Sequence, residues 1–142
     1  MPRLPRQVQK RLASEFRFAA SKIAEAGDIA EKMYYFSVFF GEAGRQLNVH
    51  WDTDLSLLHV VVQAACNQIG ARAQIPQRMP TGGFPDGFLP AIDDVSQELA
   101  AVFEDKELDA ARFYAAVSRV AELMYLVGGN GIYLHEKGAL RL

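Results

Sequence analysis

Apolar residues recur at alternating steps of three and four along most of this chain, which is the spacing of one face of an α-helix. Five stretches carry the pattern, over about residues 5–26, 29–47, 54–70, 91–104 and 108–127. A chain of 142 residues is enough for one core. We therefore expect an all-α fold, with a single helical domain over residues 1–142.

Turn-forming residues separate the helical stretches. Asp28 with Glu31 three places later forms a capping box at the start of the second helix. Residues 74–90 hold four prolines and three glycines and predict a long loop between the third and fourth helices. The glycine-rich residues 128–131 end the fifth helix, and the tail after them predicts a short C-terminal hairpin.

The composition is that of an ordinary globular protein, with 50% apolar and 23% charged residues. The lone cysteine, Cys66, cannot form an internal disulfide and indicates a reducing compartment. We expect it to be a small core residue and not a nucleophile. The longest uncharged run, 55–71, is too polar and too short to span a membrane. These features predict a cytoplasmic protein that needs no cofactor.

Charge is distributed unevenly along the chain. Residues 1–26 hold six basic and two acidic side chains, whereas residues 86–109 hold eight acidic and one basic side chain. The two segments could attract each other within the fold or across a dimer. Alternatively, the basic first helix could lie against a phosphate backbone. Its cations would then be the contacts, and they are Arg3, Arg6, Lys10, Arg11 and Arg17.

Two features predict a helix–helix interface. The second helix is apolar on nearly all sides and carries a ridge of small residues, and the third carries an uncharged polar stripe at helical spacing. The ridge consists of Ser37, Gly41 and Gly44, and the stripe of Ser56, His59, Gln63 and Asn67. Polar groups without charge indicate burial against another helix, because a helix facing water normally carries lysine or glutamate. We expect the interface within the chain or between chains, in an oligomer or a larger complex.

The connection between the second and third helices, residues 44–59, gathers residue types that occur in active and metal sites. His50, Asp52, Asp54 and His59 could ligate a metal, but no histidines are paired at i, i+4 and one aspartate is needed for capping. We therefore expect no metal site. Binding of stoichiometric zinc, iron or manganese would contradict this expectation.

Arg45 and His50, in "RQLNVH", are spaced as R-x4-H, and this spacing resembles the short motif of the HEPN superfamily of helical ribonucleases. The resemblance implies a metal-independent ribonuclease in which His50 transfers a proton and Arg45 stabilises charge on phosphate. On one continuous helix the two side chains would point about 140° apart. They converge only if the helix breaks near Asn48.

The size, the all-helical character and the basic edge of the chain also resemble the small helical subunit of CRISPR effector complexes. That resemblance implies a non-catalytic scaffold that packs against other subunits, or against itself, and contacts single-stranded RNA or DNA through the basic first helix. This is the function that we expect from the sequence, with the HEPN-like ribonuclease as the alternative.

A cleavage assay separates the two functions. If the chain is a HEPN-like ribonuclease, changing His50→Ala should abolish cleavage of single-stranded RNA, because proton transfer contributes roughly 100- to 10,000-fold to such rates. Cleavage by the His50→Ala variant at the parent's rate would exclude this role for His50.

Overall fold

The structure, a computed structural model, describes residues 4–41, 53–73 and 87–127. These residues form helices and no strand, which confirms the predicted all-α bundle. The elements are α1 (Arg6–Glu25), α2 (Ile29–Tyr35), the π-helix η1 (Phe36–Phe40), α4 (Thr53–Ala73), α5 (Phe88–Glu104) and α6 (Ala110–Val127). None of the described helices has the length and apolar character needed to cross a membrane.

The second predicted helix differs from a uniform α-helix. It begins as expected, because the Asp28 side chain accepts a hydrogen bond from the Glu31 backbone amide at 2.8 Å. After Tyr35 the helix widens into the π-turn η1, which ends at Gly41. The predicted continuation over 42–47 lies outside the described residues, as do most of the predicted 74–90 loop and the predicted C-terminal hairpin.

Helix α5, the fourth of the five predicted helices, begins earlier than the sequence pattern predicts. Gly87, with φ of +83°, adopts a left-handed conformation that favours glycine, and α5 starts at the next residue. Phe88 is fully buried and belongs to the helix, so residues 88–90 are not part of the loop. The sequence pattern places the start at residue 91, three residues too late, because Pro90 is typical of a first helical turn and the burial of Phe88 depends on the other helices.

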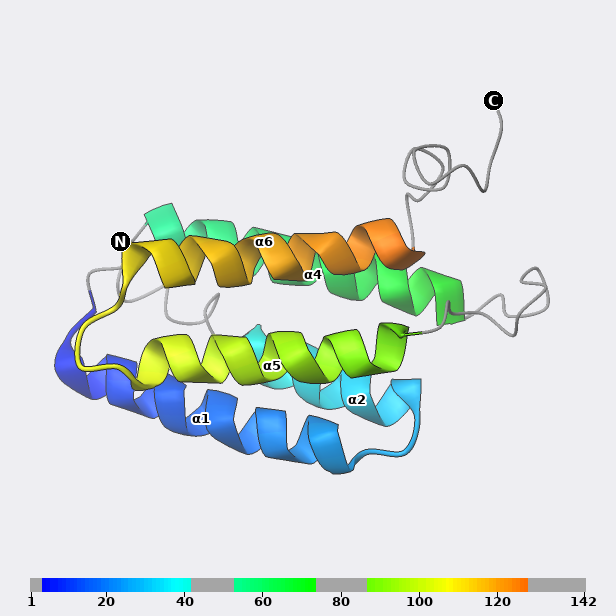
Figure 1. The fold of residues 1–142 in the computed structure, drawn as a ribbon, viewed down its shortest axis with the longest axis horizontal. Helices are drawn as coiled ribbons and strands as arrows, with labels where there is room; N and C mark the ends of the chain where they lie inside the picture. The colour runs from blue at the N-terminus through cyan, green and yellow to red at the C-terminus, as the bar shows by residue number, and fades with distance from the viewer. Residues whose placement is uncertain (1–3, 42–52, 74–86, 128–142) are drawn as a thin grey trace.

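The helices form a closed ring around one core. α1 packs along α5, α5 against α6 and α6 against α4; α4 meets η1, and η1 and α2 return to α1. Figure 1 shows the helices lying lengthwise beside one another, with α1 and α5 running in opposite directions. The N-terminal end of α1 therefore lies beside the C-terminal end of α5.

Phenylalanine side chains fill the centre of the ring. Phe16 of α1 contacts Phe40 of η1 at 4.8 Å between ring centroids and Phe103 of α5 at 5.0 Å. Phe103 also contacts Phe113 of α6 at 6.2 Å, and Phe36 packs against Phe40 at 5.0 Å. All five rings are buried, so one aromatic cluster joins four elements.

A lysine is buried at the opposite end of α1 from the basic N-terminus. Lys32 of α2 is 5% exposed, and its ammonium donates to the Ile23 carbonyl at 2.7 Å and to Asp93 Oδ1 at 2.8 Å. Ile23 lies near the end of α1 and Asp93 near the start of α5. The single ammonium therefore holds α1, α2 and α5 together, and it satisfies a carbonyl at the end of a helix.

Removing this ammonium should destabilise the fold strongly. Lys32→Ala leaves a carboxylate without its partner, and we expect the free energy of unfolding in urea to fall by about 3 kcal/mol, the lower end of the range for a broken buried pair. Asp93 is 32% exposed, so water compensates part of the loss.

Lys22 provides the matched control, since its ion pair with Glu25 is exposed and 3.8 Å long. Lys22→Ala should cost less than about 1 kcal/mol. The double variant Lys32→Met, Asp93→Asn should recover most of the stability, because no charge is then left without its partner. Equal losses for Lys32→Ala and Lys22→Ala would refute the role of the buried ammonium.

Candidate functional site

The basic helix α1 and the acidic helix α5, which are the first and fourth predicted helices, lie side by side. Arg17 Nη2 and Nε donate to the two carboxylate oxygens of Glu104 at 2.6 and 3.0 Å, and Arg17 Nη1 donates to Gln97 at 2.5 Å. The hydrogen bond from Arg17 lowers the pKa of the Glu104 carboxyl. This bidentate pair is the attraction within the fold that the uneven charge distribution had suggested.

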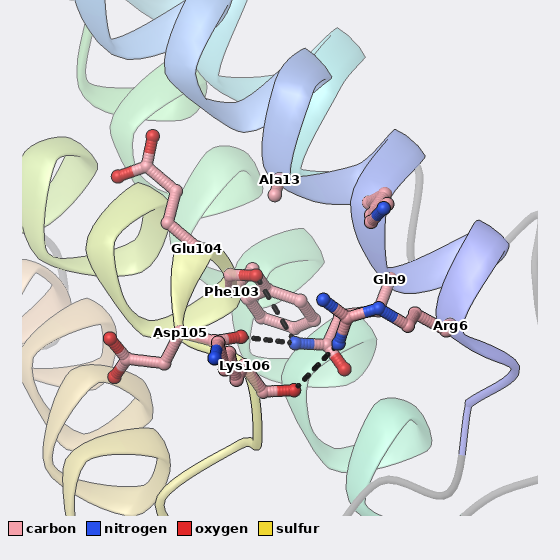
Figure 2. A pocket seen from close by; sticks show the side chains of 8 residues that line it. Arg6, Gln9, Ala13, Phe103, Glu104, Asp105 and Lys106 are labelled. Carbon is pink, nitrogen blue, oxygen red and sulfur yellow. Dashed lines mark hydrogen bonds between the residues drawn. The ribbon is translucent and has the colours of Figure 1, made fainter.

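A hollow of about 180 Å³ lies where the start of α1 meets the end of α5. Its lining includes the cations Arg6, Lys10 and Lys106, with Phe103 and Ala13 as apolar lining residues. Figure 2 shows how the α1 residues and the end of α5 face each other across it. Three cationic side chains from two separate parts of the chain therefore line one hollow.

Hydrogen bonds from α1 fix one wall of the hollow. Gln9 Nε2 donates to the carbonyls of Phe103 at 3.3 Å and Asp105 at 2.8 Å, and Arg6 Nη1 donates to the Lys106 carbonyl at 3.4 Å. These carbonyls belong to the C-terminal end of α5 and the residues after it, where helical partners are missing and the helix dipole is negative. The side chains of α1 thus cap α5 and hold the hollow's two sides together.

The two carboxylates that line the hollow are both bound to arginines outside it. Glu104 pairs with Arg17, and Asp105 Oδ2 accepts from Arg112 of α6 at 2.8 Å. In Figure 2 the carboxylates of both residues point away from Arg6 and Gln9. Within the described residues, Lys10 and Lys106 form no ion pair. The hollow is therefore locally positive.

The structure separates the five cations predicted to contact nucleic acid. Arg6 and Lys10 line the hollow, whereas Arg11 lies 3.7 Å from Glu15 and Arg17 is paired with Glu104. Arg3 lies outside the described residues. The sequence analysis missed Lys106, although it is the one basic residue within the acidic segment 86–109.

The predicted interface residues lie partly within the fold. A methyl group at Gly41 would overlap the Ser37 carbonyl oxygen of η1 itself, and it would also come 3.2 Å from Gln63 Nε2 of α4. Gln63, His59 and Ser56 are half-buried, whereas Asn67 is exposed and Gly44 lies outside the described residues. His59 Nδ1 is buried and has no hydrogen-bond partner in the described part of the chain.

The residues of the alternative functions are only partly described. Arg45, His50 and Asp52 lie outside the described ranges. Asp54 accepts a hydrogen bond from the Tyr114 hydroxyl of α6 at 2.5 Å, and no three His, Cys, Asp or Glu side chains gather into a metal site within the described residues. Burial raises the pKa of the Cys66 thiol to about 11, so the thiol stays protonated at neutral pH.

Comparisons with family models, with curated proteins and with solved structures found no match to this chain.

The Arg17–Glu104 pair should make stability depend on pH. Because the pKa of Glu104 is lower in the folded protein than in the unfolded chain, the pair stabilises the fold above the unfolded value of about 4.3. That stabilisation is lost as the pH falls through the folded value. Glu104→Gln should therefore cost up to about 1 kcal/mol at neutral pH, since the pair is exposed, and less in acid.

Urea unfolding from neutral pH down through about pH 4 measures this difference. Glu122→Gln, at an exposed glutamate of α6, is the matched control and should follow the parent at every pH. A constant gap between Glu104→Gln and the parent across the titration would contradict the assignment.

Proposed function

We propose that this protein is a non-catalytic helical subunit that holds a nucleic acid strand by its phosphate backbone, as a component of a larger assembly. The binding site is the hollow between the start of α1 and the end of α5. This function agrees with the resemblance of the chain, in size, helical character and basic edge, to the small helical subunit of CRISPR effector complexes.

The observation that carries the proposal is the charge of the hollow. Arg6, Lys10 and Lys106 line it together, and the adjacent carboxylates are already bound by Arg17 and Arg112. An entering phosphate would thus meet cations without displacing an internal ion pair. Phosphate neutralisation by lysine and arginine supplies most of the affinity in binding that does not depend on base sequence.

The hollow is smaller than the pockets that hold drug-sized ligands and cofactors. Its volume is about 180 Å³. Pockets for drug-sized ligands and cofactors span about 300–1,000 Å³. A phosphate fits the smaller volume while the rest of a polymer lies outside it, along the exposed surface of α1.

Binding to labelled single-stranded RNA and DNA across a salt series tests the proposal. With three phosphate contacts, the logarithm of the association constant should fall with the logarithm of salt concentration with a slope of about −2, since each single-strand contact contributes about −0.7. Lys10→Glu and Lys106→Glu should each weaken binding and reduce the slope by about one contact.

Arg119→Glu is the control, because it reverses the same charge on α6 outside the hollow, and it should bind as the parent does. A duplex of the same sequence distinguishes single strands from a general preference for phosphate. Binding that ignores salt, or that weakens equally in all three variants, would count against the hollow as the site. Strand cleavage in the same samples would favour the alternative ribonuclease.

A further inference from the structure

The hollow between α1 and the end of α5 is closed where the two segments touch. Gln9 Nε2 donates to the carbonyls of Phe103 and Asp105 at 3.3 and 2.8 Å. Arg6 Nη1 donates to the Lys106 carbonyl at 3.4 Å. Figure 2 shows these three hydrogen bonds running from α1 to the end of α5 and the residues after it. Because segments in hydrogen-bond contact leave no space for a polymer between them, a strand cannot pass between α1 and α5 at this point.

The core of the bundle closes the inner side of the hollow. Phe103 and Ala13 line it, and both are buried members of the apolar core. A ligand must therefore enter the hollow from solvent and leave by the same way. A phosphate within a strand is joined to sugars on both sides, which hold it at the mouth of such a site. A terminal phosphate is joined on one side only and can enter.

The cations of the hollow carry more charge than one internal phosphate neutralises. Arg6, Lys10 and Lys106 line it with three positive charges, and its two carboxylates are bound by arginines outside it. An internal phosphodiester carries one negative charge. A phosphomonoester carries about −1.5 to −2 at pH 7 and offers three acceptor oxygens. The charge of the hollow is therefore matched more closely by a terminal phosphate.

The remaining cations of α1 do not extend the hollow into a track for a phosphate backbone. Successive phosphates along this helix would have to displace carboxylates, whereas a single phosphate in the hollow displaces none. Each of the next three cations along α1 has an acidic partner: Arg11 lies 3.7 Å from Glu15, Arg17 2.6 Å from Glu104 and Lys22 3.8 Å from Glu25.

We infer that the hollow holds the terminal phosphate of a nucleic acid strand, a phosphomonoester, and not a phosphate within the strand. The inference rests on the proposed function and adds which phosphate occupies the site. Lys10 approaches this phosphate from α1 and Lys106 from the residues after α5. Arg6 still has N–H groups to donate, because a guanidinium carries five and the Lys106 carbonyl accepts from one nitrogen.

Fluorescence anisotropy with one short single-stranded DNA sequence tests the inference on the full chain. The strand is prepared with a phosphate at its 5′ end, with a phosphate at its 3′ end, and with hydroxyl groups at both ends. A phosphorylated strand should bind at least about tenfold more tightly than the hydroxyl strand, because one added charge-assisted hydrogen bond is enough for that factor. Lys10→Gln and Lys106→Gln, both at exposed positions, should each bring this ratio towards one.

Lys22→Gln is the matched control, since it removes the same charge from α1 outside the hollow and should leave the ratio unchanged. A free 5′-mononucleotide carries the same phosphomonoester without the strand. If the rest of the strand contributes to binding, the mononucleotide should displace it only at a concentration at least about tenfold higher than the unlabelled phosphorylated strand requires.

Equal binding of the phosphorylated and hydroxyl strands would overturn the inference; the proposed function would stand if the two hollow variants weakened both strands. Absence of binding by every strand would overturn both. A preference for a phosphorylated end that persists in Lys10→Gln and Lys106→Gln would place that end elsewhere on the protein and overturn the inference. Competition by the mononucleotide at the strand's own concentration would overturn it as well, because the site would then be one for a free nucleotide.

Discussion

A buried ammonium group cannot be left unpaired, and this requirement sets the arrangement of three helices in this bundle. Lys32 lies between the end of α1 and the start of α5, with one hydrogen bond to each. The contact fixes how far α1 and α5 can slide past one another. Because the two helices are antiparallel, the same register brings Gln9 to the carbonyls at the far end of α5, about 20 Å away along α1. The basic hollow therefore depends on an ion pair at the opposite end of the helices.

The basic segment 1–26 and the acidic segment 86–109 carry charges of two kinds, those that join helices and those that line the hollow. Arg17 and Arg112 neutralise Glu104 and Asp105, and these contacts tie α1 and α6 to α5. The cations that remain on the hollow are free of that task. This arrangement separates the charges that join the helices from the charges that can meet an external anion, although within each of the two segments they lie only a few residues apart.

Helical periodicity was sufficient to predict the number and order of the helices, because each buried stripe repeats at the period of the α-helix. It could not locate the π-turn at Phe36–Phe40, since the step of four between the buried Phe36 and Phe40 fits an α-helix as well, and a π-turn is defined by its hydrogen bonds. The early start of α5 was missed because burial of Phe88 depends on the other helices. Burial of Lys32 also follows from a partner 61 positions away, Asp93, which no local pattern contains.

The candidate site was predictable only in part, for the same reason. The basic character of α1 can be read directly from the sequence, and it includes Arg6 and Lys10. The neutralisation of Arg17, however, depends on Glu104, a carboxylate 87 residues later. Lys106 joins the hollow only because the end of α5 reaches α1, so its isolation within an acidic segment was the sole local signal.

The pairing of α1 with α5 also has a consequence for how the chain folds during synthesis. Arg17 and Glu104 are 87 residues apart in sequence, so the contact that joins the first helix to the ring is highly non-local. At about 5–20 residues per second, a ribosome needs roughly 4–17 seconds to make the intervening chain. During that time the apolar stripe of α1, including Phe16, lacks Phe103 as a packing partner. Folding of this bundle is therefore completed late in synthesis. Until then the exposed apolar stripe of α1 is a segment to which chaperones can bind and from which aggregation can start.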